Sequence, residues 1–273
     1  MAGSTVLREG PGFLLARFRC PPGDPRWSGE NWVGPDDHVV FPGPAMRIAR
    51  GRSEFVATAQ ETMLYNRDEV YRRALLAPDG DDCVYVAVRP GLAAEMAAYA
   101  GITGDRLFPV QHVPCRSRDY LLMRRVAHRL ESSGDAAAGL AVDEAVLGVL
   151  GHVMGAAGTA THSAPSGDAR VALEETKALL VGHDTEPPSV TAVAGRVAYS
   201  PYHLARLFRA HTGMSMYTYW RQQRLRLSVA RVLDGDERLA DIASDLGFSS
   251  HSHFTYDFRR TFGVTPHALR AAA

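Results

Sequence analysis

The chain has few of the features that mark secreted, membrane-embedded or catalytic proteins. Its 273 residues include three cysteines, an odd number that cannot form a complete disulfide framework, and no Cys-x-x-Cys pair. Its apolar runs are short for a membrane span, and its first residues lack a charged-then-apolar signal pattern. No Ser–His–Asp order, paired acids or glycine-rich phosphate loop stands out. These absences predict a cytoplasmic protein that is not an enzyme and has no cofactor and no membrane contact.

The most informative feature that is present is a repeat near the C-terminus. The segment 193–200 (VAGRVAYS) recurs 49 residues later as 242–249 (IASDLGFS). Three further positions recur 50 residues apart: Leu204 and Phe254, Phe208 and Phe258, and Gly213 and Gly263. Each copy reads as helix–turn–helix, a motif whose second helix enters the major groove of DNA. Two copies on one body predict two reading helices and a double-stranded DNA partner.

Local signals support a helix–turn–helix in each copy. Ser200 supplies a helix N-cap, and Pro201 stands at the first helical position, where its missing N–H costs nothing. In the second copy Gly247 suits the left-handed position that ends a helix, and Ser249 or Ser250 caps the next helix. The leucine and phenylalanine positions of each second helix fall on one face and should be buried, which leaves the opposite face free.

Residues 168–273 resemble the DNA-binding domain of the AraC/XylS transcription regulators. The signature that carries the resemblance is long: Ala243, Gly247–Phe248, Phe254, Phe258–Arg260, Phe262–Pro266 and Arg270. Met216 and Leu269 stand where the family often has Pro and Tyr, but both positions concern helix starts and packing. The resemblance implies a sequence-specific transcription regulator, with RNA polymerase as a candidate partner besides DNA.

The resemblance also points to DNA-facing residues. The family's DNA-facing positions fall on these seven residues: Tyr202, Ala205 and Arg206 in the first reading helix, and His251, Ser252, His253 and Tyr256 in the second. Arg206 is the leading candidate for reading a base, because arginine binds guanine O6 and N7 together, with discrimination of about 1–3 kcal/mol. The alternatives are a phosphate contact for Arg206 and packing for His253. The predicted phosphate contacts or helix-surface charges are Arg209, Arg221, Arg259 and Arg260.

The net charge is zero, because 30 basic residues match 30 acidic ones, but the charge is unevenly distributed. No acidic residue lies between Pro187 and Leu233. That stretch holds seven arginines: Arg196, Arg206, Arg209, Arg221, Arg224, Arg226 and Arg231. Phosphate contact requires local positive charge, so this basic strip supports the prediction of DNA binding.

The N-terminal region has the pattern of short strands separated by Gly, Pro, Asn and Asp. The predicted strands are 13–20, 38–41, 45–49, 53–58, 62–65, 70–76 and 83–88. Such spacing predicts a small barrel or sandwich, and many AraC-like regulators carry a cupin-like barrel at this place. Six aromatic or basic residues could line a pocket, lie in the core or lie on the surface, because the sequence does not fix which face of each strand they occupy. These residues are Trp27, Trp32, Tyr65, Tyr71, Arg72 and Tyr85.

Residues 90–155 turn helical, with helices predicted over 91–99, 116–132 and 136–154. Two apolar stripes stand out: Leu121, Leu122, Val126 and Leu130, and then Val142, Val146, Val149 and Val153. The stripes either form a homodimer interface, as helices at this place do in related regulators, or cover the barrel. The segment 155–167 is small and polar and reads as a linker.

The cysteines and two histidines are candidates for metal or redox chemistry. His112 and Cys115 have the spacing of half a zinc or copper site, which Cys83 could complete. The simpler interpretation makes the cysteines small core residues. A regulator that senses metal or redox state through Cys20, Cys83 and Cys115 stays an alternative. A cupin-type enzyme fused to a DNA-binding domain is disfavoured, since 12–89 holds one histidine, His38.

Taken together, the sequence predicts an α+β protein. Residues 1–156 form a cupin-like β-barrel with trailing helices, which senses a small-molecule effector and dimerises. Residues 157–167 are a linker, and residues 168–273 form an all-α DNA-binding domain of two helix–turn–helix units. A purely architectural DNA-binding protein is disfavoured, because reading DNA needs no additional N-terminal domain of about 150 residues.

Overall fold

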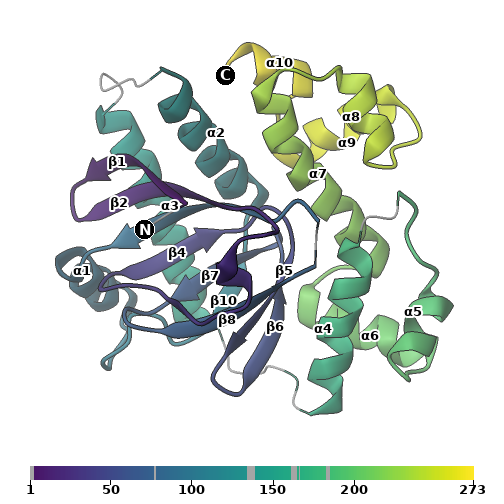
Figure 1. Ribbon diagram of the computed structural model, residues 1–273, viewed down its shortest axis with the longest axis horizontal. Helices are drawn as coiled ribbons and strands as arrows, with labels where there is room; N and C mark the ends of the chain where they lie inside the picture. Colours follow the sequence, from purple (N-terminus) through teal and green to yellow (C-terminus); the bar gives the residue numbers. More distant parts are fainter. Residues whose placement is uncertain (1–2, 77, 134–138, 161–164, 166, 183–184) are drawn as a thin grey trace.

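The computed structural model describes the chain except for residues 1–2, 77, 134–138, 161–164, 166 and 183–184 (Figure 1). Two antiparallel sheets form the N-terminal part, and helices form the C-terminal part. The order of the six-stranded sheet is β1 (Ser4–Gly10), β2 (Phe13–Cys20), β9 (Asp81–Val88), β4 (Asp37–Phe41), β7 (Glu61–Tyr65) and β10 (His112–Pro114). The order of the four-stranded sheet is β3 (Asn31–Trp32), β8 (Val70–Leu75), β5 (Met46–Arg50) and β6 (Ser53–Ala57). The predicted α+β class is confirmed.

Strand β9 shows how the six-stranded sheet separates two environments. Its side chains alternate, as the pleat of a strand requires. Val84, Val86 and Val88 are buried in the main apolar core with the helices that cover the sheet, whereas Cys83 and Tyr85 line a pocket on the other face. The four-stranded sheet closes the pocket from the opposite side, so the pocket lies between the two sheets.

All seven predicted strands are present, with bounds that differ by at most two residues. Three further strands, β1, β3 and β10, escaped prediction. Strand β1 is mostly exposed or half-buried and mixes charged with apolar residues, β3 has two residues, and β10 ends on Pro114. Short or edge strands carry little of the alternation on which the prediction depended.

Helix α1 (Pro90–Ala100) lies between β9 and β10, and helices α2 (Ser117–Ser133) and α3 (Gly139–Thr159) follow β10. The valine stripe of α3 is buried in the main core, so this stripe covers the sheet and is not available to a partner. The stripe on α2 is buried or half-buried and packs against the same core. Helix α3 continues to Thr159, so residues 157–159 of the predicted linker are helical; residues 161–164 and 166 lie outside the described residues.

By length and composition alone, α3 could cross a membrane, although the sequence was expected to contain no such segment. The reason is its composition: Gly, Ala and Val dominate, and Asp143 and Glu144 are its only charged residues. A core helix meets the same criterion. Here 39% of the most apolar window is buried inside the protein, and Arg8 of β1 pairs with Asp143 through contacts of 2.6 and 2.8 Å.

The described residues after α3 form seven helices: α4 (Asp168–Val181), α5 (Val190–Arg196), α6 (Pro201–Thr212), α7 (Met216–Asp234), α8 (Leu239–Asp245), α9 (His251–Phe262) and α10 (Pro266–Ala271). The pairs α5–α6 and α8–α9 are the two predicted helix–turn–helix units. The long helix α7 joins them and packs on α2. One apolar core runs from the six-stranded sheet through α2 to α7, α8 and α9, so the two halves share a hydrophobic interior.

Candidate nucleic-acid interface and sensor pocket

The two reading helices, α6 and α9, begin and end in the same way. The Ser200 hydroxyl accepts a hydrogen bond from the backbone N–H of His203, and the Ser250 hydroxyl accepts one from His253. Ser250, rather than Ser249, is therefore the cap of α9. Both helices have 12 residues and end at a glycine with positive φ, Gly213 at 73° and Gly263 at 81°. The repeat seen in the sequence is thus a repeat of backbone structure.

The outer face of α6 presents an aromatic ring and a guanidinium side by side. Leu204 and Phe208 are fully buried on the inner face. Tyr202 is 66% exposed on the outer face, and Arg206 donates a hydrogen bond of 3.4 Å to its hydroxyl. The Arg206 guanidinium also lies 5.7 Å from the centre of the Tyr202 ring. These contacts hold Arg206 against the Tyr202 side chain, and Ala205 and Arg209 are exposed beside it.

On α9, three of the four expected residues are exposed and one is held inward. His251, Ser252 and Tyr256 are exposed. His253 is half-buried: Nδ1 lies 2.9 Å from the Ser249 hydroxyl, and Nε2 lies 3.1 Å from a carboxylate oxygen of Asp257. These contacts match the packing interpretation of His253. The i, i+4 spacing of His253 and Asp257 is the sequence signal that indicates it.

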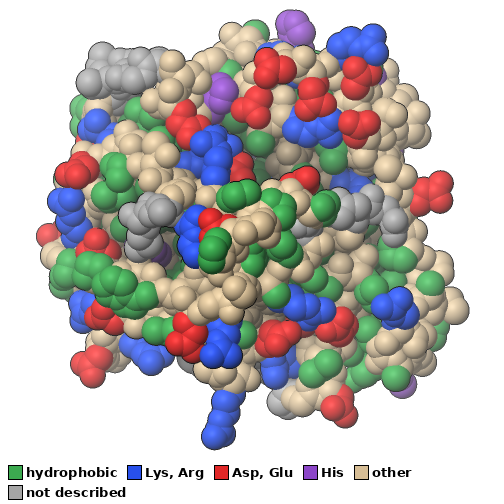
Figure 2. All heavy atoms as spheres, viewed as in Figure 1, with side chains coloured by type: hydrophobic (Ala, Val, Ile, Leu, Met, Phe, Trp, Pro, Cys, Tyr) green, Lys and Arg blue, Asp and Glu red, His purple; other side chains and the backbone are tan. Residues whose placement is uncertain are grey.

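Four of the seven arginines in the basic strip, all of them on α7, make contacts within the protein. The arginines on α7 bind within the protein: Arg221 pairs with Asp257 at 3.4 Å, Arg224 stacks on Trp220 at 4.2 Å, and Arg231 pairs with Glu237 and Asp245. The acidic partners lie outside the acid-free stretch and are brought in by the fold. Figure 2 shows acidic and basic side chains intermingled on one face of the molecule. Arg196, Arg206 and Arg209 remain exposed.

A buried polar cluster joins the sheets to the DNA-reading half; we call it the interdomain cluster (Thr58, Glu61, Glu174, Lys177, Tyr219). Lys177, the only lysine in the chain, is 4% exposed and lies between Glu61 at 3.1 Å and Glu174 at 3.2 Å. Burial opposes the ammonium charge, yet the two carboxylates raise the pKa of Lys177 above its ordinary value. Tyr219 of α7 donates to Glu61 at 3.3 Å and lies 2.7 Å from the Thr58 hydroxyl.

Two further contacts strengthen this junction. The Glu174 carboxylate accepts a hydrogen bond of 2.6 Å from the backbone N–H of Val56, next to the end of β6. Arg226 of α7 donates to the carbonyl oxygens of Ala59 and Cys115, the latter at 2.7 Å. Buried charges persist only where such partners satisfy them. The sequence pattern identified none of the five residues of the interdomain cluster as functional, and the presence of a single lysine is the one signal that could have done so.

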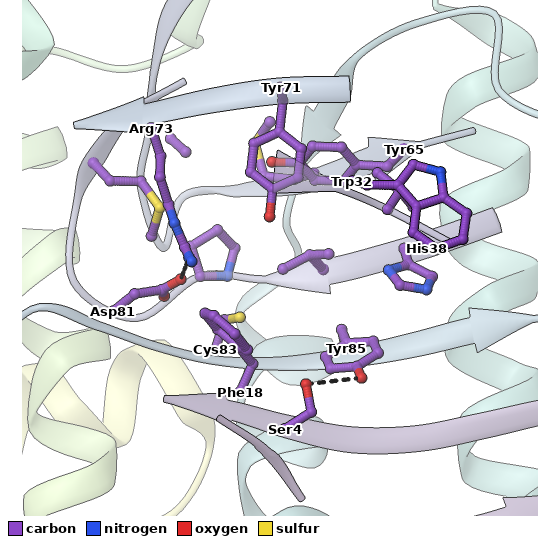
Figure 3. Close-up of a pocket in the computed structure, with 16 residues that line it drawn as sticks. Ser4, Phe18, Trp32, His38, Tyr65, Tyr71, Arg73, Asp81, Cys83 and Tyr85 are labelled. Atoms are coloured by element: carbon purple, nitrogen blue, oxygen red, sulfur yellow. Dashed lines mark hydrogen bonds and ion pairs between the residues drawn. The ribbon is translucent and has the colours of Figure 1, made fainter. Parts of the chain in front are cut away.

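The pocket between the sheets, which we call the sensor pocket, has a volume of about 70 Å³ (Figure 3). Four residues expected on a pocket do line it: Trp32, Tyr65, Tyr71 and Tyr85. Trp27 and Arg72 do not; Trp27 packs beside Arg73 at 5.0 Å, and Arg72 pairs with Glu30 at the surface. Residues Arg73 and Asp81 were missed, although Arg73 shares a strand face with Tyr71.

Burial sets the protonation of the pocket's polar groups. It lowers the pKa of His38 to about 4, so the imidazole is neutral at pH 7. Burial raises the pKa of Asp81 to about 7, against the opposing charge of Arg73. It also raises the pKa of Tyr71 to about 12 and that of Tyr65 further.

The three cysteines do not come together in one cluster. Cys20 and Cys83 pack with Phe18, whereas Cys115 belongs to the main core. All three are free and buried, and burial raises the pKa of each thiol, which disfavours the reactive thiolate. Burial lowers the pKa of His112 to about 4. Within the described ranges, no group of three or more His, Cys, Asp or Glu side chains is arranged to hold a metal ion.

The helix–turn–helix domain family matches residues 193–272. The regulatory protein SoxS of Escherichia coli K12 is 36% identical to this chain over 88 residues, which are 32% of this chain and 82% of SoxS. The transcriptional regulator Rob of Salmonella typhimurium is 34% identical over 94 residues, 34% of this chain and 32% of Rob.

Two solved structures have a weaker likeness to the fold. An AraC-type regulator from Chromobacterium violaceum is 29% identical, covers 38% of this chain and 92% of its own, and has a TM-score of 0.36. ToxT from Vibrio cholerae is 11% identical, covers 95% of this chain and 98% of its own, and has a TM-score of 0.38. These TM-scores are too low to add to the fold described above.

Paired reading helices with matched caps, exposed outer faces and a common connecting helix define a DNA-binding protein built on two helix–turn–helix units. Its relatives of known function are transcription regulators, and the match covers most of SoxS. The chain belongs to the AraC/XylS family of transcription regulators.

Proposed function

We propose that this regulator binds a specific operator and that a small molecule in the sensor pocket changes its operator affinity. One observation carries the proposal: the strands that line the pocket also hold the DNA-reading half. Ala57 and Met63 line the pocket, while the adjacent Thr58 and the nearby Glu61 belong to the interdomain cluster. A ligand that displaces β6 or β7 therefore acts on the contacts to α4 and α7 within one or two residues.

We propose that α6 and α9 enter successive major-groove faces about 34 Å apart. Six exposed residues would contact DNA directly: Tyr202, Ala205, Arg206, His251, Ser252 and Tyr256. Arg209 would contact phosphate. His253 is assigned a positioning role at the start of α9, because Ser249 and Asp257 hold its ring.

The remaining assignments follow the family. Residues 1–156 act as the sensor and dimerisation domain, 157–167 as the linker and 168–273 as the DNA-binding domain. A homodimer would use surfaces other than the buried valine stripe, such as the exposed Leu140 and Leu147 on α3. The protein acts in the cytoplasm as a regulator and not as an enzyme, with RNA polymerase as a further partner.

The test begins by selecting the operator from random duplex DNA with the full-length protein. A broad panel of small molecules is then screened for a change in melting temperature, and each hit is assayed for its effect on operator affinity. The proposal expects at least one hit to change operator affinity, and expects Thr58→Val with Tyr219→Phe to reduce that response. If every stabilising compound leaves operator affinity unchanged, the regulator works without an effector in this pocket.

A further inference from the structure

We infer that the sensor pocket accepts an uncharged, planar aromatic molecule that carries a hydrogen-bond donor beside an acceptor, as an aromatic amide does. This inference rests on the proposed function, in which the pocket is the effector site. It goes further because the side chains around the pocket define the chemical class of the ligand.

The pocket has aromatic walls on both sides. On the six-stranded sheet His38 stacks on Tyr85 at 4.9 Å, with Tyr65 as the cross-strand neighbour of His38. Tyr71, on the four-stranded sheet, lies with its ring centre 5.0 Å from that of Tyr65. Figure 3 shows Trp32 and Tyr71 on the side opposite His38 and Tyr85, with the cavity between them. Rings that face each other across a slot favour a flat aromatic guest over a branched or saturated one.

One end of the pocket is polar, and some of its polar atoms have no hydrogen-bond partner among the described residues. Arg73 and Asp81 form an ion pair of 3.1 Å, and their side chains are 2% and 4% exposed. Arg73 Nε, a donor, and Asp81 Oδ1, an acceptor, have no hydrogen-bond partner among the described residues. Cys83 lies beside Asp81 but offers only a weak S–H donor. Buried polar atoms are normally paired, so a ligand with an adjacent acceptor and donor would complete this end.

The ion pair is held in place before any ligand arrives. The Arg73 guanidinium lies between two rings, 4.7 Å from Phe18 and 5.0 Å from Trp27, and donates to Asn31 at 3.4 Å. A fixed donor and acceptor recognise a ligand with less loss of side-chain entropy than mobile ones do.

The charge of the pocket selects a neutral ligand. At pH 8, above the pKa of about 7 that burial gives Asp81, the charges of Arg73 and Asp81 cancel, and His38 is uncharged because burial lowers its pKa to about 4. A carboxylate or ammonium on the ligand would be buried without a net opposite charge, which is strongly unfavourable.

The volume of the pocket limits the ligand to about one ring. A cavity of about 70 Å³ is smaller than the roughly 150 Å³ engineered cavity that binds benzene. Trp32 lines the pocket and is 57% exposed, so it lies at the mouth, and the inference requires its indole to move outward when a ring enters.

The experiment titrates the full-length protein with four single-ring probes by calorimetry at pH 8. Benzamide has a donor and an acceptor, benzoate has only acceptors and a charge, benzamidine has only donors and a charge, and toluene has neither. We expect benzamide to bind at least tenfold more tightly than each of the other three. Equal or tighter binding of benzoate, benzamidine or toluene overturns the inference, as does failure of all four probes to bind.

Two variants locate the binding. Arg73→Met with Asp81→Leu replaces the ion pair by apolar groups, a change that proteins often tolerate; it should abolish the preference for benzamide over toluene. Arg72→Met, on the opposite face of the same strand, should keep that preference. If the preference survives in the double variant, the ion pair is not the recognition element. The ranking of the probes on the unaltered protein decides the question even if the double variant fails to fold.

Failure of this inference can be told apart from failure of the proposed function. If another class of compound binds and changes operator affinity, the ligand class is wrong and the regulation stands. If benzamide binds as expected but no compound in the panel changes operator affinity, the ligand class stands and the regulation is wrong.

Discussion

At the scale of single residues, the outer face of α6 combines two kinds of contact. Arg206 is restrained by Tyr202, whereas Arg209 lies exposed near the end of the helix, about two turns from the cap at Ser200. The first residues of a reading helix reach base edges, and later ones pass the phosphates. The two arginines should therefore affect DNA binding in different ways.

We predict that Arg206→Ala costs about 1–3 kcal/mol on the selected operator and relaxes the preference at one base pair. Arg259→Ala, an exposed residue in the last turn of α9, serves as the phosphate control. It should weaken all sequences similarly and reduce the salt slope by about one. Binding titrations at several salt concentrations, on matched and scrambled DNA, measure the sequence preference and the salt slope of each variant. Equal weakening on both DNAs by Arg206→Ala would show that Arg206 holds phosphate.

A second residue-scale prediction concerns Gly247 in the turn of the second unit. Its φ is 73°, and an added Cβ would lie 2.0 Å from the carbonyl oxygen of Thr185, so Ala meets both backbone strain and a clash. Gly213 has the same φ but open space around it. Gly213→Ala should cost about 1–2 kcal/mol, and Gly247→Ala at least about 1 kcal/mol more. Urea unfolding measures the loss of folding free energy in each variant. Similar losses in the two variants would show that the close approach of Gly247 to Thr185 does not constrain the residue at this position.

At the scale of elements, α4 and α7 connect the DNA-reading half to the sheets. Lys177 of α4 and Tyr219 of α7 converge on Glu61 at the start of β7. Strand β6 ends one residue before Thr58, so the cluster lies where β6 and β7 meet. In the proposed function these helices would carry a displacement of either strand to both helix–turn–helix units.

We predict that Lys177→Met destabilises the protein by about 3–5 kcal/mol, because it leaves Glu61 and Glu174 buried without a cation. Adding Glu61→Gln and Glu174→Gln should recover much of that loss. Arg47→Met, which removes a half-exposed partner of Glu175 on the same helix, is the control and should cost no more than about 1 kcal/mol. Thermal unfolding at pH 7 measures the stability of each variant. If Lys177→Met loses no more stability than Arg47→Met, the interdomain cluster contributes little to the stability of the fold.

Sequence patterns predicted the elements better than their contacts. Alternation and caps gave the main strands, the α6 cap at Ser200 and the repeat, because these depend on neighbouring residues. The partners of Arg221 and Arg231 are Asp257, Glu237 and Asp245, and Lys177 meets Glu61 over 116 positions; only the folded chain brings them together. The sequence did not show which side of β8 faces the pocket, so Arg72 was predicted as a possible pocket residue and Arg73 was missed.

At the scale of the whole molecule, the DNA-reading half is not a freely tethered domain. Its core is continuous with that of the sheets, and the interdomain cluster is buried between them. The two reading units therefore have a fixed orientation relative to each other and to the sensor pocket.

We predict that one full-length chain protects two successive major-groove faces, about two helical turns, on a selected half-site. Hydroxyl-radical footprinting of the full-length protein measures this. His251→Ala with Tyr256→Ala should shorten the protection to one face, whereas the surface change Arg72→Met should leave it intact. Protection of a single face by the unaltered protein would show that only one unit reads DNA.

The burial of the only lysine has a consequence for recombining this regulator with others. A chimera that joins residues 1–156 to another family member's DNA-binding domain keeps Glu61 and the carbonyl oxygens of Ala59 and Cys115 but loses their partners. Such hybrids should accumulate in soluble form only when the grafted domain also carries Lys177, Tyr219 and Arg226 at the matching positions. The interface thereby limits which N-terminal and DNA-binding halves can be exchanged, both in the laboratory and by gene fusion.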